Sequence, residues 1–266
     1  MTSHTQLVAV ITGGSSGLGL AMSVQLAHEG YTPVILARNK ARLDEAVTQL
    51  RQVDEQAQGF VCDVTSQADL DQTRQVIQTQ FPKIDFLILN AGVVHVELLE
   101  DAQDMAALKA DIEIDLWGTI QTARAFESLL SSGARVLCIS SGFGLVGVAG
   151  YTAYCAAKAG VITFAEAWRR ELLRRGISVY VACPSDIDTP QFHQEQTSLP
   201  AWLKIADTRG TSMAPEAAAA KILRRCTGGR FLIIINSEIK LLLFLSRFLP
   251  RRWMDRLLDR LFPKPS

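Results

Sequence analysis

The sequence lacks an excess of charge of either sign, because 27 Lys and Arg residues balance 27 Asp and Glu residues in a chain of 266. A neutral protein has no global field that would attract a polyanion. Nucleic acid is therefore not an expected partner, although a local basic stretch lies within the last 30 residues. The hydrophobic fraction of 48% is sufficient for a large core.

Cysteine is scarce and scattered. The five cysteines form no C-x-x-C pair and no cluster with histidine, so the sequence indicates neither a disulfide framework nor a metal site. Such cysteine usage is typical of a reducing compartment. Residues 1–6 are mostly polar rather than an apolar leader, and no stretch reaches the roughly 20 apolar residues of a spanning helix. We therefore expect a cytoplasmic protein.

Internal repeats, low-complexity tracts and linkers are absent as well. Short apolar runs alternate instead with segments of helical periodicity, and residues 105–126 are expected to be one long helix. The runs expected to form strands are residues 7–11, 33–37, 60–64, 84–89, 135–140, 177–183 and 231–235. This alternation predicts a single doubly wound α/β domain of the Rossmann type over residues 1–237, with a seven-stranded parallel sheet and helices on both faces.

A glycine-rich turn follows the first expected strand. Residues 12–19 read Thr-Gly-Gly-Ser-Ser-Gly-Leu-Gly, and a helical segment comes next. Glycines let a backbone approach a pyrophosphate closely, and the N-terminus of a helix supplies free N–H groups and the positive end of a dipole. The order of strand, turn and helix therefore predicts a dinucleotide site. The alternative is an ordinary tight turn.

A second group of polar residues follows the fifth expected strand. Ser141 comes at its end, Tyr154 begins the exposed face of a helix, and Lys158 lies one turn further along the same face. A lysine cation beside a phenol favours the phenolate, so we expect a lowered pKa of Tyr154 and an acid–base role near neutral pH. Taken alone, the pattern Y-x-x-x-K is also compatible with a helix that merely contains both residues.

The turn T-G-x-x-x-G-x-G, the stretch Asn90-Ala91-Gly92 and the interval of 13 residues from Ser141 to Tyr154 together resemble the short-chain dehydrogenase/reductase family. The resemblance implies that Ser141 bonds a substrate carbonyl oxygen, that Tyr154 is the acid and base, and that Lys158 binds the nicotinamide ribose. Members are commonly dimers or tetramers, which implies a homo-oligomer. The implied cofactor site consists of Gly13, Ser15, Ser16, Gly17, Leu18, Gly19, Asp63, Val64, Asn90, Ala91, Gly92, Tyr154, Lys158, Pro184, Ile187 and Thr189.

The end of the second expected strand bears on the choice of cofactor. An acid at this place would bind the ribose 2′-hydroxyl of NAD, but the sequence has Ala37 followed by Arg38. A guanidinium here can pair with a 2′-phosphate. Arg38 therefore predicts NADP(H) as the cofactor, although a basic residue at the start of a helix can also be simply solvated.

Two residues depart from the pattern of the family. Asp115 stands where members usually carry an Asn, which holds a kinked backbone and links the active-site lysine to solvent through water. Asp keeps the acceptor and loses the amide donor. Ser185 replaces the usual glycine after Pro184. We expect Asp115 to serve the catalytic proton relay, and the alternative is a non-catalytic NADP-binding scaffold.

Residues 190–213 have weak periodicity and are expected to form a lid over the substrate. Residues 184–195, with Pro200 and the later Met213-Ala-Pro-Glu216, resemble the pattern P-P-D-T-D-T-P-x-F-x-x-E of 3-ketodihydrosphingosine reductases. This resemblance implies NADPH-dependent reduction of 3-oxosphinganine to sphinganine. Reduction of another lipophilic ketone, or oxidation of a lipophilic alcohol, remains the alternative, with a steroid, a retinoid or a 3-oxoacyl group as the substrate.

The C-terminal extension, residues 238–266, differs in character from the rest. Over residues 238–262, Leu, Phe and Trp alternate with Arg, and Pro250 interrupts the run. This amphipathic pattern suits helices that lie in a membrane interface, so one expectation is peripheral membrane contact. The other is that the extension packs on its own subunit or on a partner subunit.

Overall fold

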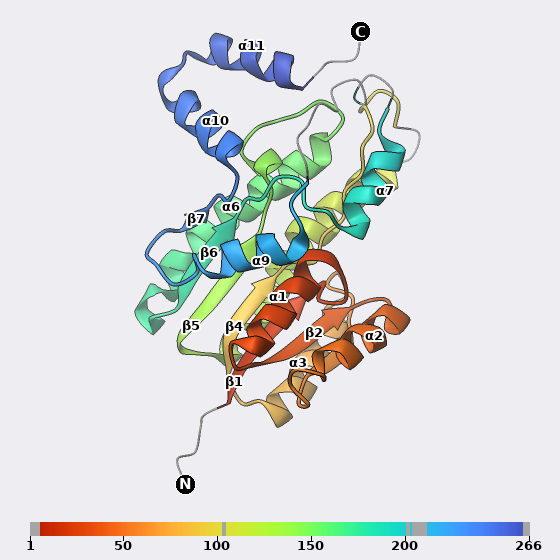
Figure 1. Ribbon diagram of the computed structural model, residues 1–266, viewed down its shortest axis with the longest axis vertical. Coiled ribbons are helices and arrows are strands. Elements are labelled where there is room, and N and C mark those ends of the chain that lie inside the picture. The colour runs from red at the N-terminus through yellow and green to blue at the C-terminus, as the bar shows by residue number, and fades with distance from the viewer. Residues whose placement is uncertain (1–5, 103–104, 201–202, 204–211, 263–266) are drawn as a thin grey trace.

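The computed structural model describes residues 6–102, 105–200, 203 and 212–262. At its centre lies a seven-stranded parallel sheet in the order β3-β2-β1-β4-β5-β6-β7 (Figure 1). The predicted doubly wound α/β fold is confirmed. The strands are β1 (Leu7–Thr12), β2 (Tyr31–Ala37), β3 (Gln58–Val61), β4 (Ile84–Leu89), β5 (Leu130–Ile139), β6 (Ser178–Ala182) and β7 (Leu232–Ile233).

Helices cover both faces of the sheet because its strands are apolar on both sides. In β1, Val8 and Val10 belong to one buried cluster, whereas Ala9 and Ile11 belong to the other. Such a strand can leave neither face in water. One face carries α1 (Gly17–His28), α2 (Lys40–Leu50) and α9 (Pro215–Leu223). The other carries α3 (Gln67–Gln80), α5 (Gly118–Phe126) and α6 (Thr152–Leu172).

The segment predicted as one long helix, residues 105–126, is divided into three. A short helix, α4 (Met105–Ala110), passes into the π-helical turn η1 (Asp111–Trp117), and α5 follows. Wide turns of this kind are frequent at functional sites. This one carries two buried acids, Asp111 and Asp115. Gly118 allows the close packing that follows, because a Cβ there would lie 2.7 Å from the Val64 side chain.

The third strand ends at Val61, three residues before the predicted end at residue 64. The reason is a polar turn that leads into α3. The Asp63 carboxylate accepts hydrogen bonds from the Thr65 N–H at 2.9 Å and from the Thr65 hydroxyl at 2.8 Å. Ser66 then caps the helix by accepting from the Asp69 N–H at 3.2 Å.

Two segments from the last third of the chain lie over the carboxyl ends of the strands. A helix, α7 (Pro190–Ser198), begins the predicted lid, of which residues 201–202 and 204–211 lie outside the described residues. The C-terminal extension forms α10 (Ser237–Phe248) and α11 (Arg251–Leu261), which stand at the upper end of Figure 1. Across the described segments, no helix is long and apolar enough to cross a membrane.

Candidate active site

The carboxyl ends of the strands open into a cleft of about 1490 Å³. It lies over the junction of β1 and β4, where the strand order reverses and where open α/β sheets bind their ligands. Its volume exceeds the roughly 300–1,000 Å³ of ordinary small-molecule pockets, which leaves room for a dinucleotide and a second molecule. All the predicted site residues line this cleft except Asp63 and Asp115.

The glycine-rich turn has the shape of a cradle for an anion. Gly13 and Gly17 have φ angles of 65° and 52°, which favour glycine. A Cβ on Gly19 would lie 2.3 Å from the carbonyl oxygen of Gly13, so only glycine fits there. Ser16 precedes α1 and makes no side-chain capping bond. The first N–H groups of α1 therefore meet the cleft uncapped, as the binding of a dinucleotide pyrophosphate requires.

Basic residues lie at the mouth of the cleft beyond β2. Arg38 and Arg42 are exposed and line it; from the sequence, Arg42 was expected to be solvated at the start of a helix rather than to belong to the cofactor site. Its position is fixed because its backbone N–H donates to the Asn39 side chain at 3.0 Å. Asp63 was expected in the cofactor site but does not line the cleft, since its carboxylate accepts hydrogen bonds from Thr65. Only its neighbour Val64 does so.

The side chain of Asn90 has a structural role in the cleft wall. Its Nδ2 donates to the carbonyl oxygens of Thr12 at 3.0 Å and of Gly13 at 3.2 Å. The end of β4 is thereby tied to the glycine-rich turn. At the other side of the cleft, Thr189 accepts from the Phe192 N–H at 3.2 Å and so starts α7. Each residue thus positions a segment of the cleft wall.

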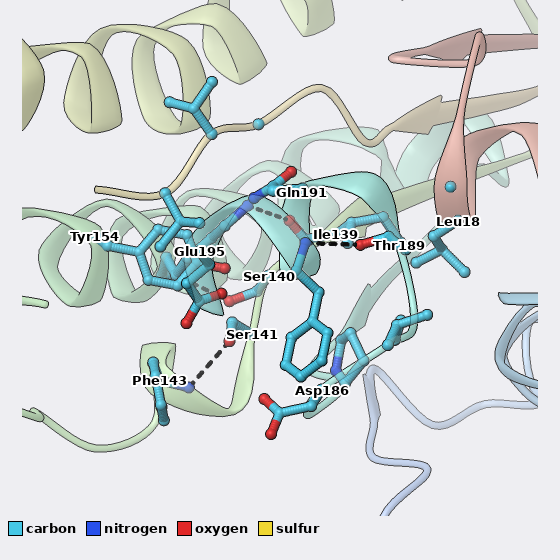
Figure 2. A pocket seen from close by; sticks show the side chains of 18 of the residues that line it. Leu18, Ile139, Ser140, Ser141, Phe143, Tyr154, Asp186, Thr189, Gln191 and Glu195 are labelled. Atoms are coloured by element: carbon cyan, nitrogen blue, oxygen red, sulfur yellow. Dashed lines mark hydrogen bonds between the residues drawn. The ribbon is translucent and has the colours of Figure 1, made fainter. Parts of the chain in front are cut away.

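Ser141 and Tyr154 lie together at one end of the cleft, with Leu18 and Thr189 further along it (Figure 2). Ser141 caps the short helix η3 (Gly142–Gly144) by accepting from the Phe143 N–H at 3.2 Å. Tyr154 lies in the first turn of α6, and Lys158 follows one turn later.

A close contact clamps α6 against the end of β5. The Ser140 hydroxyl donates to the Lys158 carbonyl oxygen at 2.8 Å. A Cβ on Gly144 would lie 2.6 Å from the Ser140 Oγ and 2.8 Å from the Lys158 carbonyl oxygen. The glycine therefore allows the loop after β5 to approach the helix, and this approach sets the position of Ser141 relative to Tyr154.

Lys158 is buried, and its ammonium group contacts two oxygens and a ring. Its Nζ lies 3.1 Å from Asp115 Oδ2 and donates to the Ile139 carbonyl oxygen at 3.3 Å. It lies 5.5 Å from the centre of the Tyr154 ring. Asp115 is itself fixed, because its Oδ1 accepts from the Val93 N–H at 2.7 Å. A direct ion pair thus stands where the family usually has an amide linked through water.

The prediction of a lowered pKa for Tyr154 is wrong. Burial raises that pKa well above its ordinary value, and the nearby charge of Asp115 raises it further, while a hydrogen bond from Ser141 opposes them. The physical reason is that Asp115 pairs with the Lys158 ammonium and offsets its field at the phenol. Glu195 and Asp111 act in the same direction as Asp115. Tyr154 is therefore a phenol at neutral pH, ready to donate a proton.

Two acids near Tyr154 were not assigned from the sequence. Glu195 reaches the cleft from α7 and accepts a hydrogen bond from the Tyr151 hydroxyl at 2.5 Å. Figure 2 shows its carboxylate beside Tyr154 and Ser141. Asp111 is buried and contacts His95 Nδ1 at 2.8 Å. The signal for Glu195 was its place in the motif P-x-F-x-x-E. Asp111 gave no signal, because a lone acid in a helical segment usually lies on a solvated face.

The C-terminal extension also contributes to the cleft. The Phe262 ring packs edge-on against Phe143, with ring centres 5.7 Å apart. This part of the extension therefore packs on its own chain and adds an apolar wall near Ser141. The residues of α10, α11 and the position after α11 that line the cleft are Ser237, Glu238, Ile239, Leu242, Leu243, Ser246, Leu261 and Phe262.

Comparisons with known proteins agree with this geometry. The family model described as short chain dehydrogenase matches residues 7–199. A human protein named short-chain dehydrogenase/reductase 3 is 26% identical over 252 residues, which cover 93% of this chain and 81% of that protein. A 3-dehydrosphinganine reductase of Arabidopsis thaliana is 33% identical over 229 residues, covering 84% and 68% respectively.

The fold is shared with solved structures. A short chain dehydrogenase from Burkholderia cenocepacia in complex with NADP superposes with a TM-score of 0.79 at 22% identity, covering 98% of each chain. Similarity at this level of identity concerns the fold alone. The match of the family model extends over more than half of the chain and includes the glycine-rich turn, Ser141, Tyr154 and Lys158. The protein is therefore an oxidoreductase that belongs to the short-chain dehydrogenase/reductase family.

Proposed function

We propose that this enzyme uses NADPH to reduce a ketone on a lipophilic substrate. The observation that carries the proposal is the pair of hydroxyl groups of Tyr154 and Ser141, which lie in the same cleft as the glycine cradle. When bound, the reduced nicotinamide supplies a hydride to the carbonyl carbon. Ser141 and Tyr154 polarise the carbonyl oxygen through their hydroxyl groups, and Tyr154 then donates its proton to that oxygen.

Arg38 and Arg42 support NADPH rather than NADH. Both lie at the end of the cleft beyond β2, which in this fold is the place of the adenosine ribose. β2 ends at Ala37 without an acid that would accept from a 2′-hydroxyl. A 2′-phosphate placed there would meet two guanidinium groups and form charge-assisted hydrogen bonds.

Glu195 supports 3-oxosphinganine as the substrate. This ketone carries an ammonium group on the carbon next to its carbonyl carbon, and an acyl chain. The charge of the Glu195 carboxylate acts on the pKa of Tyr154, and this proximity would allow it to pair with that ammonium when the carbonyl oxygen meets Tyr154. The apolar wall made by Phe143, Leu243 and Phe262 suits the acyl chain. A steroid or a retinoid offers no cation to pair with Glu195.

The extension supports a place at the surface of a membrane. Its side away from the cleft exposes Leu241, Phe244, Phe248 and Trp253, which are 51% to 72% exposed. The exposed Arg251, Arg252 and Arg256 lie beside them and could contact anionic headgroups. A peripheral position at the cytoplasmic face would bring the cleft to a lipophilic substrate that partitions into the bilayer. A homo-oligomer, implied by membership of the family, is compatible with this placement.

The experiment is a measurement of NADPH oxidation with a panel of ketones and with NADH in parallel. The panel contains 3-oxosphinganine, its N-acetyl derivative, a steroid ketone and a 3-oxoacyl thioester. We expect kcat/KM for 3-oxosphinganine to exceed that for the uncharged N-acetyl derivative at least about tenfold, the range of one charge-assisted contact. In Glu195→Gln this preference should vanish, whereas the exposed control Glu166→Gln should keep it. Equal rates for both ketones in the wild type would rule out the role of Glu195.

The alternative of a non-catalytic NADP-binding scaffold makes a different prediction. A scaffold would bind NADPH and oxidise it with no ketone of the panel. The direct contact of Asp115 with Lys158 is the feature that motivates this alternative.

A further inference from the structure

Two buried carboxyl groups and a histidine form a row behind Lys158. Asp111 and Asp115 both lie on η1, and their side chains are 0% exposed. Asp115 Oδ2 is 3.1 Å from Lys158 Nζ, and Asp111 Oδ1 is 2.8 Å from His95 Nδ1. The His95 side chain is 38% exposed and lines the cleft. The row therefore begins at solvent and ends at the lysine beside Tyr154.

The charges in this row favour the presence of an additional proton. Asp115 faces Lys158, His95 and the Tyr154 phenol, while Asp111 faces His95 and Asp115. One buried ammonium stands against two buried carboxyl groups, and an unpaired buried charge is strongly unfavourable. Burial raises the pKa of Asp111 to about 6, and the charge of Asp115 raises it further, although the contact with His95 lowers it. Burial also raises the pKa of Asp115.

The position for that proton can be identified. Within the described part of the chain, Asp111 Oδ2 is buried without a hydrogen-bond partner. A protonated carboxyl group leaves this oxygen uncharged, whereas a carboxylate leaves a desolvated charge there. Asp111 and Asp115 are four residues apart on η1, about one helical turn, and the charge of Asp115 raises the pKa of Asp111, so the two carboxyl groups interact electrostatically.

Turnover creates a need for such a proton. Each reduction removes the phenol proton of Tyr154, which must be restored before the next cycle. The Lys158 side chain beside the phenol is only 6% exposed, so it has little access to bulk water. The family's usual link through an Asn and water is altered here, because Asp115 replaces the Asn.

We propose that His95 and Asp111 form the outer half of a proton path that restores Tyr154 through Asp115 and Lys158. The path rests on the proposed ketone reduction. Tyr154 gives its O–H proton to the substrate oxygen, and the phenolate takes a proton from the Lys158 ammonium. The Asp115 carboxylate takes the proton of Asp111 and passes it to Lys158, which becomes an ammonium again. Asp111, now a carboxylate, takes a proton from His95. His95 takes a proton from water. One proton is thus drawn from solvent for each ketone reduced, and every side chain returns to its starting form.

The test compares His95→Gln and Asp111→Asn with the wild type at saturating NADPH and ketone. We expect kcat at about pH 7 to fall about tenfold in each variant, with the KM of the ketone and the Kd of NADPH within about twofold of the wild type. Added imidazole should restore the rate of His95→Gln in proportion to its concentration, which a purely structural defect would not allow. The exposed control His28→Gln should behave as the wild type does.

A second measurement does not depend on turnover. In the wild type, carboxyl ¹³C NMR should show Asp111 titrating near pH 6, and Asp115→Asn should lower that value because it removes a neighbouring charge. Unchanged kcat in both variants, or a loss of kcat that imidazole does not rescue, would overturn the path. Titration of Asp111 near its ordinary value would overturn it as well. If the wild type reduces no ketone, the proposed function fails, and the NMR titration alone decides whether the row holds the proton.

Discussion

Asp111→Asn is expected to make the protein more stable at neutral pH while it slows turnover. The Asp111 side chain is fully buried, and burial raises its pKa from the ordinary 3.8 to about 6. The difference of about 2.2 units corresponds to about 3 kcal/mol at 1.36 kcal/mol per unit. This is the free energy by which ionisation of Asp111 weakens the fold above pH 6. Asn removes that charge.

The sign follows from proton binding. Between about pH 4 and pH 6 the folded state keeps the Asp111 proton while the unfolded state has lost it, so the contribution of Asp111 to stability falls as pH rises. Asp111 Oδ2 has no hydrogen-bond partner among the described residues. The amide of an Asn in its place would be left unpaired there, which lowers the free energy of unfolding by about 1 kcal/mol. The net gain is therefore about 2 kcal/mol at pH 8. Near pH 4 we expect a loss of about 1 kcal/mol.

Urea unfolding followed by tryptophan fluorescence at several pH values between 4 and 8 measures this difference. The matched control is Asp44→Asn, an exposed acid that pairs with Lys40 at 2.8 Å. Its effect should stay within about 0.5 kcal/mol and vary little with pH, because exposed ion pairs contribute little. A difference between Asp111→Asn and the wild type that does not change with pH would refute the reasoning.

Three further perturbations test other parts of the account. Arg38→Glu should raise the KM of NADPH at least about tenfold and change the KM of NADH little, since it removes one guanidinium contact with a 2′-phosphate. Steady-state kinetics with both cofactors measures the two KM values. Gly19→Ala should abolish NADPH binding in a fluorescence titration, because the new Cβ would lie 2.3 Å from the Gly13 carbonyl oxygen. The control Gly30→Ala should bind NADPH normally, since the space around Gly30 is open, although its φ of 86° strains a residue with a Cβ. Phe244→Ser with Phe248→Ser should reduce flotation with anionic liposomes, whereas Leu173→Ser, equally exposed but outside the extension, should not.

Periodicity and motif spacing were sufficient to predict the succession of strands and helices along the chain and most of the predicted residues that line the cleft. The alternation of Val8, Ala9, Val10 and Ile11 between two cores is visible in the sequence as an unbroken apolar run. The glycine-rich turn could be located because its positive φ angles leave little choice of residue.

Electrostatic balance could not be predicted in the same way. The expected effect of Lys158 on Tyr154 considered one pair of residues, whereas the pKa of Tyr154 depends on Asp115, Glu195 and burial together. These groups come from η1, α6 and α7, and only the tertiary structure brings them to one point. The π-helical turn that buries Asp111 could not be predicted either, because local periodicity indicates one regular helix over residues 105–126.

The measurement that tests the central claim most directly is the rate of NADPH oxidation by Tyr154→Phe with 3-oxosphinganine. This substitution removes one hydroxyl and leaves the ring that packs near Tyr151. We predict that NADPH binding, followed by its fluorescence, is unchanged and that kcat falls at least about a hundredfold, because the proton donor is lost. A variant that oxidises NADPH as fast as the wild type would contradict the assignment of Tyr154 as the proton donor of a ketone reductase.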